Sequence, residues 1–223
     1  IYNYSAGDEA GDGVTITNNR VHEVSTGISA NYEGVVRGNV VWAATSSGIS
    51  GTSIGELSGN TVWGSATGIS FSGNAIENNT LTANNVGLAF SSGVASGNRI
   101  YGNALGVDSN GNSLLRNNLI WDNTNAVRMN GGYNGTEQQG IANNTIVQTG
   151  GTAIVVDGAS NARINSNIID LRGGAIGIAV SPNSQNGYNS DYNLFNQALG
   201  TTLTRWENRN FNSRPDWVYE TGF

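Results

Sequence analysis

The sequence predicts an all-β fold: a right-handed, single-stranded parallel β-helix with three short strands per coil and about nine to ten coils, closed by a short C-terminal capping helix. Three observations predict it. An asparagine recurs along the chain, an apolar residue follows two positions later, and a small residue paired with an aliphatic one follows eight to ten positions later. Strands this short cannot bury an inward face alone, so the repeats must stack on one another.

The recurring asparagines set the register of the predicted coils. The first six are 19 to 21 residues apart and the last four are 23 to 26 apart. A buried asparagine at each turn can hydrogen-bond the backbone and the amides of the coils above and below, which offsets the cost of burying a polar group. We therefore expect a continuous asparagine ladder made of Asn19, Asn39, Asn60, Asn79, Asn98, Asn118, Asn144, Asn167 and Asn193.

Three apolar columns accompany the ladder and predict the inward side of the three strands. The second column runs from Gly27-Ile28 to Gly177-Ile178, and the third lies three residues before each asparagine, as at Ile16 and Val36. Successive coils pair in parallel at about 4.8 Å, so nine ladder positions give a rod of roughly 40 Å. The first column has no exception and consists of Val21, Val41, Val62, Leu81, Ile100, Ile120, Ile146, Ile169 and Phe195.

The repeat resembles that of the right-handed parallel β-helix proteins, the pectate-lyase-like superfamily. The segments Asn60-Thr61-Val62-Trp63, Asn79-Thr80-Leu81 and Asn98-Arg99-Ile100-Tyr101, each followed by a Gly-Ile-like pair, carry the resemblance, which covers residues 14 to 195. The superfamily also includes polygalacturonases, alginate epimerases, phage tailspikes and large surface proteins. The resemblance therefore implies the fold and leaves both catalytic and non-catalytic functions open.

Both ends of the chain depart from the repeat. Ile1 and Tyr2 fit the places after an asparagine just upstream, so we expect the chain to be part of a longer solenoid. The repeat stops after Phe195, which predicts a solenoid over residues 1–195 and a cap over residues 196–223. Within the cap, residues 202–207 are expected to form a short helix. The aromatic residues expected to close the solenoid end with it are Phe211, Trp217 and Phe223.

Composition narrows the class of partner. All ten basic residues are arginines, the formal net charge is −6, and no basic cluster occurs, so nucleic acid and anionic membranes are not expected partners. No apolar run approaches the roughly 20 residues of a membrane-spanning helix. Cysteine is absent, which excludes disulfides and thiolate metal sites. We expect an extracellular or cell-surface protein.

The position three residues after each ladder asparagine should face outward, because its neighbour faces inward. Aromatic rings there could stabilise neighbouring strands, contact a second copy of the chain or hold sugar rings by stacking. The adjacent outward column is partly apolar, at Val40, Leu119, Ile168 and Leu194, which keeps the subunit contact open. The position reads His22, Trp42, Trp63, Thr82, Tyr101, Trp121, Val147, Asp170 and Asn196.

Asp108, Arg128 and Asp157 are the best catalytic candidates, because we expect them to fall in one outward column over three consecutive coils. Pectate-lyase-like enzymes use an arginine base near carboxylate-bound calcium, so the resemblance makes these residue types suggestive. Two carboxylates that flank an arginine are, however, more often an exposed ion pair between strands. Other signatures of the superfamily are missing, since the chain has no Asp-Asp pair, no Asp-Pro-His and no lysine.

Two insertions, over residues 130–140 and 181–191, leave the predicted solenoid at the same corner two coils apart. Tyr133 and Tyr188, with Glu137, Gln138 and Gln139, could wall a carbohydrate-binding groove there. A glycine-rich segment over residues 7–13 carries three carboxylates and is a calcium candidate, although its spacing is not that of an EF-hand. Those carboxylates belong to Asp8, Glu9 and Asp12.

Taken together, these features favour a non-catalytic structural or binding module of a larger secreted or cell-surface protein. It would contact polysaccharide or associate with itself through the exposed aromatic residues. No cofactor other than calcium is expected. The alternative is a carbohydrate-active enzyme, a lyase before a hydrolase or an epimerase, acting on an acidic polysaccharide through Arg128 and its neighbours.

Overall fold

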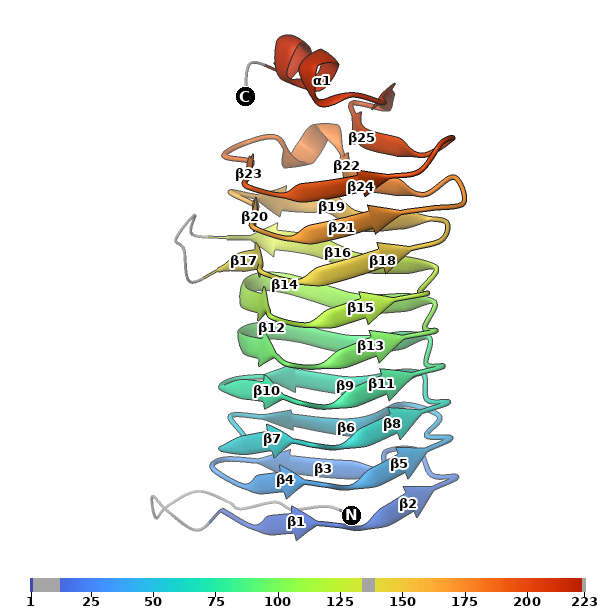
Figure 1. Ribbon diagram of the computed structural model, residues 1–223. Helices are drawn as coiled ribbons and strands as arrows, with labels where there is room; N and C mark the ends of the chain where they lie inside the picture. Colours follow the sequence, from blue (N-terminus) through green and yellow to red (C-terminus); the bar gives the residue numbers. More distant parts are fainter. Residues whose placement is uncertain (2–12, 134–138, 222–223) are drawn as a thin grey trace.

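The chain forms a parallel β-solenoid whose coils stack into a rod, with one short helix at the C-terminal end (Figure 1). The computed structural model describes residues 1, 13–133 and 139–221. Those residues contain nine strand positions on each of three faces, which make nine stacked coils. The predicted fold class is confirmed, and the nine coils agree with the nine to ten expected.

The first face of the rod is a sheet of nine parallel strands, which begin directly after the ladder asparagines. Each strand pairs in register with the equivalent strand of the next coil, as in Val62 opposite Leu81 and Leu81 opposite Ile100. The strands are β2 (Arg20–His22), β5 (Val40–Trp42), β8 (Thr61–Trp63), β11 (Thr80–Thr82), β13 (Arg99–Tyr101), β15 (Leu119–Trp121), β18 (Thr145–Gln148), β21 (Ile168–Leu171) and β24 (Leu194–Gln197).

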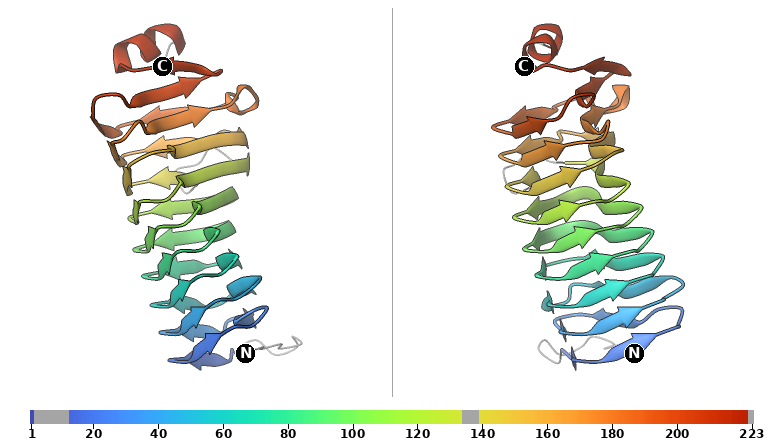
Figure 2. Two further views of the ribbon diagram at one scale, coloured as in Figure 1. Left: turned by 90° about the vertical axis from the view of Figure 1, so that its right-hand side faces the viewer. Right: turned by 45° about the vertical axis from the view of Figure 1, so that its right-hand side comes forward.

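The second and third faces form one continuous sheet, because β12 (Val86–Ser96) and β14 (Leu105–Arg116) run across both. The second face also contains β3 (Ile28–Asn31), β6 (Ser47–Thr52), β9 (Thr67–Ser72), β16 (Asn125–Gly132), β19 (Thr152–Ser160), β22 (Ile176–Val180) and β25 (Thr202–Trp206). The third face contains β1 (Thr15–Thr17), β4 (Val35–Arg37), β7 (Glu56–Ser58), β10 (Ala75–Glu77), β17 (Gly140–Ala142), β20 (Arg163–Asn165) and β23 (Asn189–Asp191). The coils stack along the whole rod (Figure 2), and buried side chains from all three faces form one cluster inside it.

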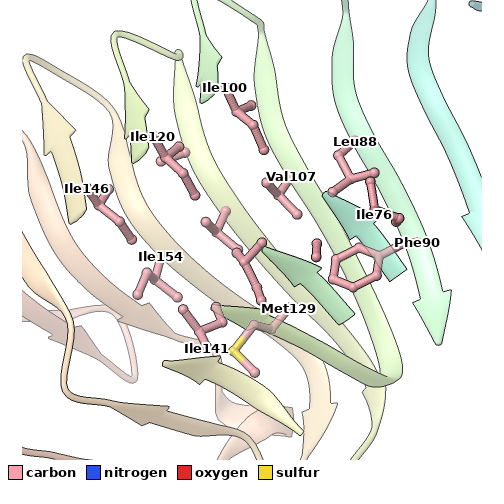
Figure 3. Packing of buried hydrophobic residues seen from close by; sticks show 14 of the residues in the cluster. Ile76, Leu88, Phe90, Ile100, Val107, Ile120, Met129, Ile141, Ile146 and Ile154 are labelled. Atoms are coloured by element: carbon pink, nitrogen blue, oxygen red, sulfur yellow. The ribbon is translucent and has the colours of Figure 1, made fainter. Parts of the chain in front are cut away.

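The core is a stack of aliphatic side chains contributed by all three faces. Ile100 and Ile120 come from the first face, Val107 and Ile154 from the second, and Ile141 from the third (Figure 3). The first predicted column is buried except at its two ends, where Val21 and Phe195 are partly buried and pack against the core. Equivalent residues are superposed because parallel strands pair in register, so the inward columns follow the sequence repeat.

Both corners of the first face turn on single residues in the left-handed backbone region. The residue before each ladder asparagine has a positive φ in all nine coils, from Asn18 (57°) to Tyr192 (55°), and glycine or asparagine fills most of these positions. These residue types adopt that conformation at the lowest cost. The opposite corner uses a left-handed residue after the strand in the first six coils, as at Ala43 and Gly102. Five of the 32 glycines occupy these two corners.

The asparagine ladder lies at the corner between the third and first faces and is continuous. In all eight steps the Nδ2 of one asparagine donates to the Oδ1 of the next coil at 2.9–3.1 Å. The same Oδ1 also accepts the backbone N–H of the preceding asparagine at 2.9–3.0 Å. A polar group can stay in the interior because each coil satisfies its neighbour.

A second, shorter ladder occupies the other corner of the first face. The backbone N–H of Ser65 donates to Asn84, that of Asn84 to Asn103, and that of Asn103 to Asn123, each through Oδ1 at 2.9–3.0 Å. In the next coil Gln148 continues it by donating to the Asn123 carbonyl at 2.8 Å. The signal for this ladder was a second asparagine five residues after Asn79, Asn98 and Asn118.

The C-terminal cap differs from the prediction. Residues 202–206 form strand β25, which pairs in parallel with β22, so the expected helix at 202–207 is wrong and parallel pairing continues to Trp206. A helix there would have left the edge of β22 unpaired. The chain then returns through β26 (Arg209–Phe211), antiparallel to β25, into α1 (Arg214–Thr221). Phe211 and Trp217 are buried, as expected for a cap, and Phe223 lies outside the described residues.

Candidate functional site

The outward side of the first face carries the aromatic side chains that the sequence predicts there. We call this surface the aromatic face. The aromatic column is the set of positions three residues after the ladder asparagines, from His22 to Trp121. His22 stacks on Trp42 with ring centroids 4.3 Å apart, and Trp42 stacks on Trp63 at 5.2 Å. Tyr101 stacks on Trp121 at 4.3 Å. The three ring pairs are within 11° of parallel, so each ring shields a face of its neighbour.

The aromatic column is interrupted once, at Thr82. Strand pairing places Thr82 directly between Trp63 and Tyr101, so the two stacks are separated by one coil without a ring. After Trp121 the column continues with Val147 and no further ring. The surface is therefore two short aromatic stacks rather than one continuous one.

A second outward column lies beside the aromatic column on the same strands. Its N-terminal part is polar except at Val40, with Thr61, Thr80 and Arg99 in register, and Arg20 places its guanidinium 5.8 Å from the Trp42 ring. Its C-terminal part is aliphatic except at Thr145, which lies between Leu119 and Ile168. The exposed aliphatic members are Leu119 (41% exposed), Ile168 (47%) and Leu194 (63%).

Arg128 and Asp108 form a bidentate ion pair on the second face. Nε donates to Oδ1 at 3.1 Å and Nη2 to Oδ2 at 2.5 Å. Asn130 donates to the same Oδ1 at 2.6 Å, so both carboxylate oxygens are engaged. The hydrogen bond to Asp108, together with the charge of that carboxylate, raises the pKa of Arg128 above its usual value. The pair thus holds the arginine as a cation, which opposes the role of a proton-accepting base.

Asp157 does not share that column. Pairing places Val155 opposite Arg128, and Asp157 lies two residues further along β19, where the register shifts. Asp157 lies 13 residues after its ladder asparagine, whereas Asp108 and Arg128 each lie ten residues after theirs, so the three positions are not equivalent. The negative charge of Asp157 still contributes to the raised pKa of Arg128. The predicted three-coil constellation is reduced to one ion pair with a second carboxylate nearby.

The two insertion tyrosines are buried, so the expectation that they wall a groove is wrong. Tyr133 is 2% exposed, and its Oη donates to the Ser109 carbonyl at 2.9 Å. Tyr188 is 4% exposed and packs edge-on against Trp206, with centroids 5.4 Å apart. Burial raises the pKa of both hydroxyls above the usual 10.0. Both phenol rings point inward because each insertion must bury apolar surface in order to pack against the solenoid.

The rest of the insertion region offers a shallow hollow. Gln139, Arg163, Asn165 and Tyr192 line a cavity of about 270 Å³ on the third face. Gln139 donates to Asn112 at 3.0 Å, which ties the end of the first insertion to the neighbouring coil. Glu137 and Gln138 lie outside the described residues, so their predicted contribution to a groove remains a prediction.

The calcium prediction also falls on undescribed chain, since Asp8, Glu9 and Asp12 belong to residues 2–12. In the ranges that the structure describes, no group of three or more histidine, aspartate, glutamate or cysteine side chains could hold a metal ion. Across the same ranges, no helix is long and apolar enough to cross a membrane.

Fold and surface together define the class: the chain is a right-handed parallel β-helix protein with stacked aromatic residues on one outer face. Residues 2–111, just under half of the chain, match the family model described as periplasmic copper-binding protein (NosD). No curated protein and no solved structure matches the chain.

The residues of this chain do not fit the copper site that the family description implies. Proteins hold copper mainly through histidine, cysteine and methionine. The chain has no cysteine, one histidine and one methionine. Met129 is fully buried in β16, and the His22 ring, five coils away in β2, stacks on Trp42. The two soft ligands therefore cannot meet at one ion.

Proposed function

We propose that this chain is a non-catalytic β-helix module that holds a polysaccharide on its aromatic face. The observation that carries the proposal is the pair of aromatic stacks on an outward-facing sheet, next to a column of hydroxyl and guanidinium groups. A sugar ring has apolar C–H faces and a rim of hydroxyls. Aromatic rings with a few well-placed hydrogen-bond donors are suited to both parts.

The chemistry of the second face supports binding rather than catalysis. A lyase of the superfamily would need Arg128 to accept a proton, whereas the bidentate contact with Asp108 stabilises its charged form. The same contact engages the carboxylate that would otherwise be free to hold calcium. We infer that the Asp108–Arg128 pair links β14 to β16 and takes no part in chemistry.

The family description supports an extracytoplasmic location, because it names a periplasmic protein. Polysaccharides are abundant outside the cytoplasm, and a rod of stacked coils presents its binding groups at a regular spacing. A repeating surface suits a repeating polymer.

Polysaccharide binding is tested by affinity electrophoresis through gels that contain cellulose-derived, xylan, pectate or alginate chains. The wild-type chain should be retarded by at least one of them, and Trp63→Ala should migrate as it does in a gel without polysaccharide. Tyr192→Ala is the matched control, because it removes an aromatic side chain that is 81% exposed at the corner between the third and first faces, outside the aromatic column. Equal retardation of all three proteins, or none of the wild type, would contradict the proposal.

Self-association is a second candidate, favoured by the exposed aliphatic column at the C-terminal end of the aromatic face. Leu119, Ile168 and Leu194 would bury apolar surface if a second copy packed there. Sedimentation velocity over a hundredfold concentration range should then show a dimer, and Ile168→Asp should abolish it. A monomer at every concentration would eliminate this candidate and leave the polysaccharide proposal untouched.

A further inference from the structure

We infer that the interruption of the aromatic column at Thr82 is the binding site for one pyranose ring of a glycan chain. We call this place the Thr82 gap, bounded by the rings of Trp63 and Tyr101. The inference rests on the proposed polysaccharide binding and adds where on the aromatic face a sugar ring is held.

Stacking leaves few ring faces free, and two of them border the gap. One face of Trp63 is covered by Trp42, and one face of Tyr101 is covered by Trp121. The other face of each ring is turned toward the coil of Thr82, whose side chain is too small to cover it. Elsewhere in the column a ligand would meet ring edges or, before His22 and beyond Trp121, a single ring face.

The width of the gap suits a sugar. Neighbouring coils are about 4.8 Å apart, so rings two coils apart are separated by about 9.6 Å. Two carbon contacts of about 3.5–4.0 Å each, with the thickness of a puckered ring and its axial hydrogens, occupy about 8–9 Å. A flat aromatic ring would need only about 7 Å and would leave space on one side. The gap therefore favours a pyranose over a planar ligand.

Hydrogen-bonding groups lie beside the gap on the same strands. Thr82 forms its floor, Thr80 is two residues earlier in β11, and Arg99 is the neighbour of Thr80 in β13. No side-chain hydrogen bond or ion pair within the described residues involves these three side chains. Their hydroxyl and guanidinium groups are available for the hydroxyls at the rim of a sugar ring.

Filling the gap tests the inference. Thr82→Trp supplies the missing ring and joins the two stacks, so the fold should be kept while the sugar is excluded. Val147→Trp is the matched control, because it adds the same ring after Trp121, where no second ring faces it. The probes are cellohexaose, xylohexaose and hexagalacturonate, each immobilised, with binding followed by biolayer interferometry and folding by circular dichroism.

The wild type should bind at least one hexasaccharide, Thr82→Trp should lose about tenfold or more in affinity, and Val147→Trp should stay within about twofold. Thr82→Val, which removes only the hydroxyl, should lose a smaller amount and keeps the test valid if the tryptophan variant misfolds. Wild-type affinity in Thr82→Trp and in Thr82→Val would overturn the Thr82 gap as the site while leaving binding to the aromatic face intact. Failure of the wild type to bind any probe would overturn the proposed function itself.

Discussion

The asparagine ladder and the aromatic column both repeat once per coil and stand three residues apart, yet the ladder is unbroken and the column is interrupted. Asparagine occupies its position in all nine coils, whereas rings are missing at Thr82 and after Trp121. Burial explains the difference. A missing amide in the interior leaves its neighbours' hydrogen bonds unsatisfied, while a missing ring on the surface is replaced by water. Inward columns are therefore fixed by folding, and outward columns can vary for function.

The largest expected effect comes from breaking the ladder at its centre. The Nδ2 of Asn98 donates to the Ile76 carbonyl and to the Oδ1 of Asn118. Its Oδ1 accepts hydrogen bonds from the backbone N–H and from the side-chain Nδ2 of Asn79. Asn98→Ala should lower the free energy of unfolding by about 3–5 kcal/mol, since several buried partners lose their hydrogen bonds at once. Urea denaturation measures it.

The matched control is Asn85→Ala, which removes an exposed asparagine near the other corner of the neighbouring coil. It should change the free energy of unfolding by less than about 0.5 kcal/mol. A loss below about 1 kcal/mol in Asn98→Ala would mean that the ladder is not the constraint that keeps the interior column unbroken.

The buried tyrosines give the next largest effect and extend the comparison to high pH. Because burial raises the pKa of Tyr133 and of Tyr188, the unfolded chain ionises near pH 10.0 while the folded chain keeps both protons. The contribution of the two tyrosines to the free energy of unfolding is then fully present below pH 10. Above pH 10 it is lost, by about 1.4 kcal/mol per group for each further pH unit until the folded groups ionise. Unfolding free energies at pH 8 and pH 11 measure this loss.

Replacing both tyrosines by phenylalanine should remove their share of the alkaline loss. Each variant is compared with itself at pH 8, so the cost of the lost Tyr133 hydrogen bond cancels. If the double variant lost as much stability between pH 8 and pH 11 as the wild type, ionisation of these two hydroxyls would not be the cause.

Filling the Thr82 gap should have a smaller effect of opposite sign. Thr82→Trp creates ring contacts with Trp63 and Tyr101, so the free energy of unfolding should rise by about 0.5–1.5 kcal/mol for each pair formed. A thermal melt beside the wild type detects this change. A destabilised Thr82→Trp would show that the outer column cannot accept a ring there and would weaken the contrast with the ladder.

The smallest effect is expected from the exposed ion pair. Asp108→Asn should lower the free energy of unfolding by less than about 1 kcal/mol, because Arg128 is 46% exposed on its side chain and water screens the charges. A cation whose pKa is raised contributes stability that is fully present below its unfolded pKa, which for arginine lies far above pH 10, so this contribution should be constant from pH 6 to pH 10. A loss above about 2 kcal/mol, measured by urea denaturation at low and high salt, would contradict the surface assignment.

The inward columns could be predicted from sequence because they repeat residue types that the interior requires. The same reasoning failed where the repeat is irregular or absent. Asp157 lies 13 residues after its ladder asparagine and not ten, and the Ala153-Ile154 pair marks Val155 as the true neighbour of Arg128. Residues 202–206 carry no repeat signature, and they form a strand because they pair with the edge of β22, which would otherwise be unpaired.

The candidate site was predictable in position but not in form. Alternation along the strand placed the aromatic residues outward, and the structure adds that their rings stack parallel to one another. Spacing alone could not show which ring faces stay free, because that depends on side-chain rotamers and on the residues of both neighbouring coils. Tyr133 and Tyr188 lie in insertions without a repeat, so the sequence offered no measure of their burial.

The asparagine ladder also gives the rod an electrical direction. Every Nδ2–H points toward the C-terminal coils and every Oδ1 toward the N-terminal ones, in all eight steps from Asn19 to Asn193. Strand dipoles largely cancel in a sheet, but these side-chain dipoles add head to tail, as peptide dipoles do in a helix. The first ladder corner is thereby left with partial negative charge and the last with partial positive charge.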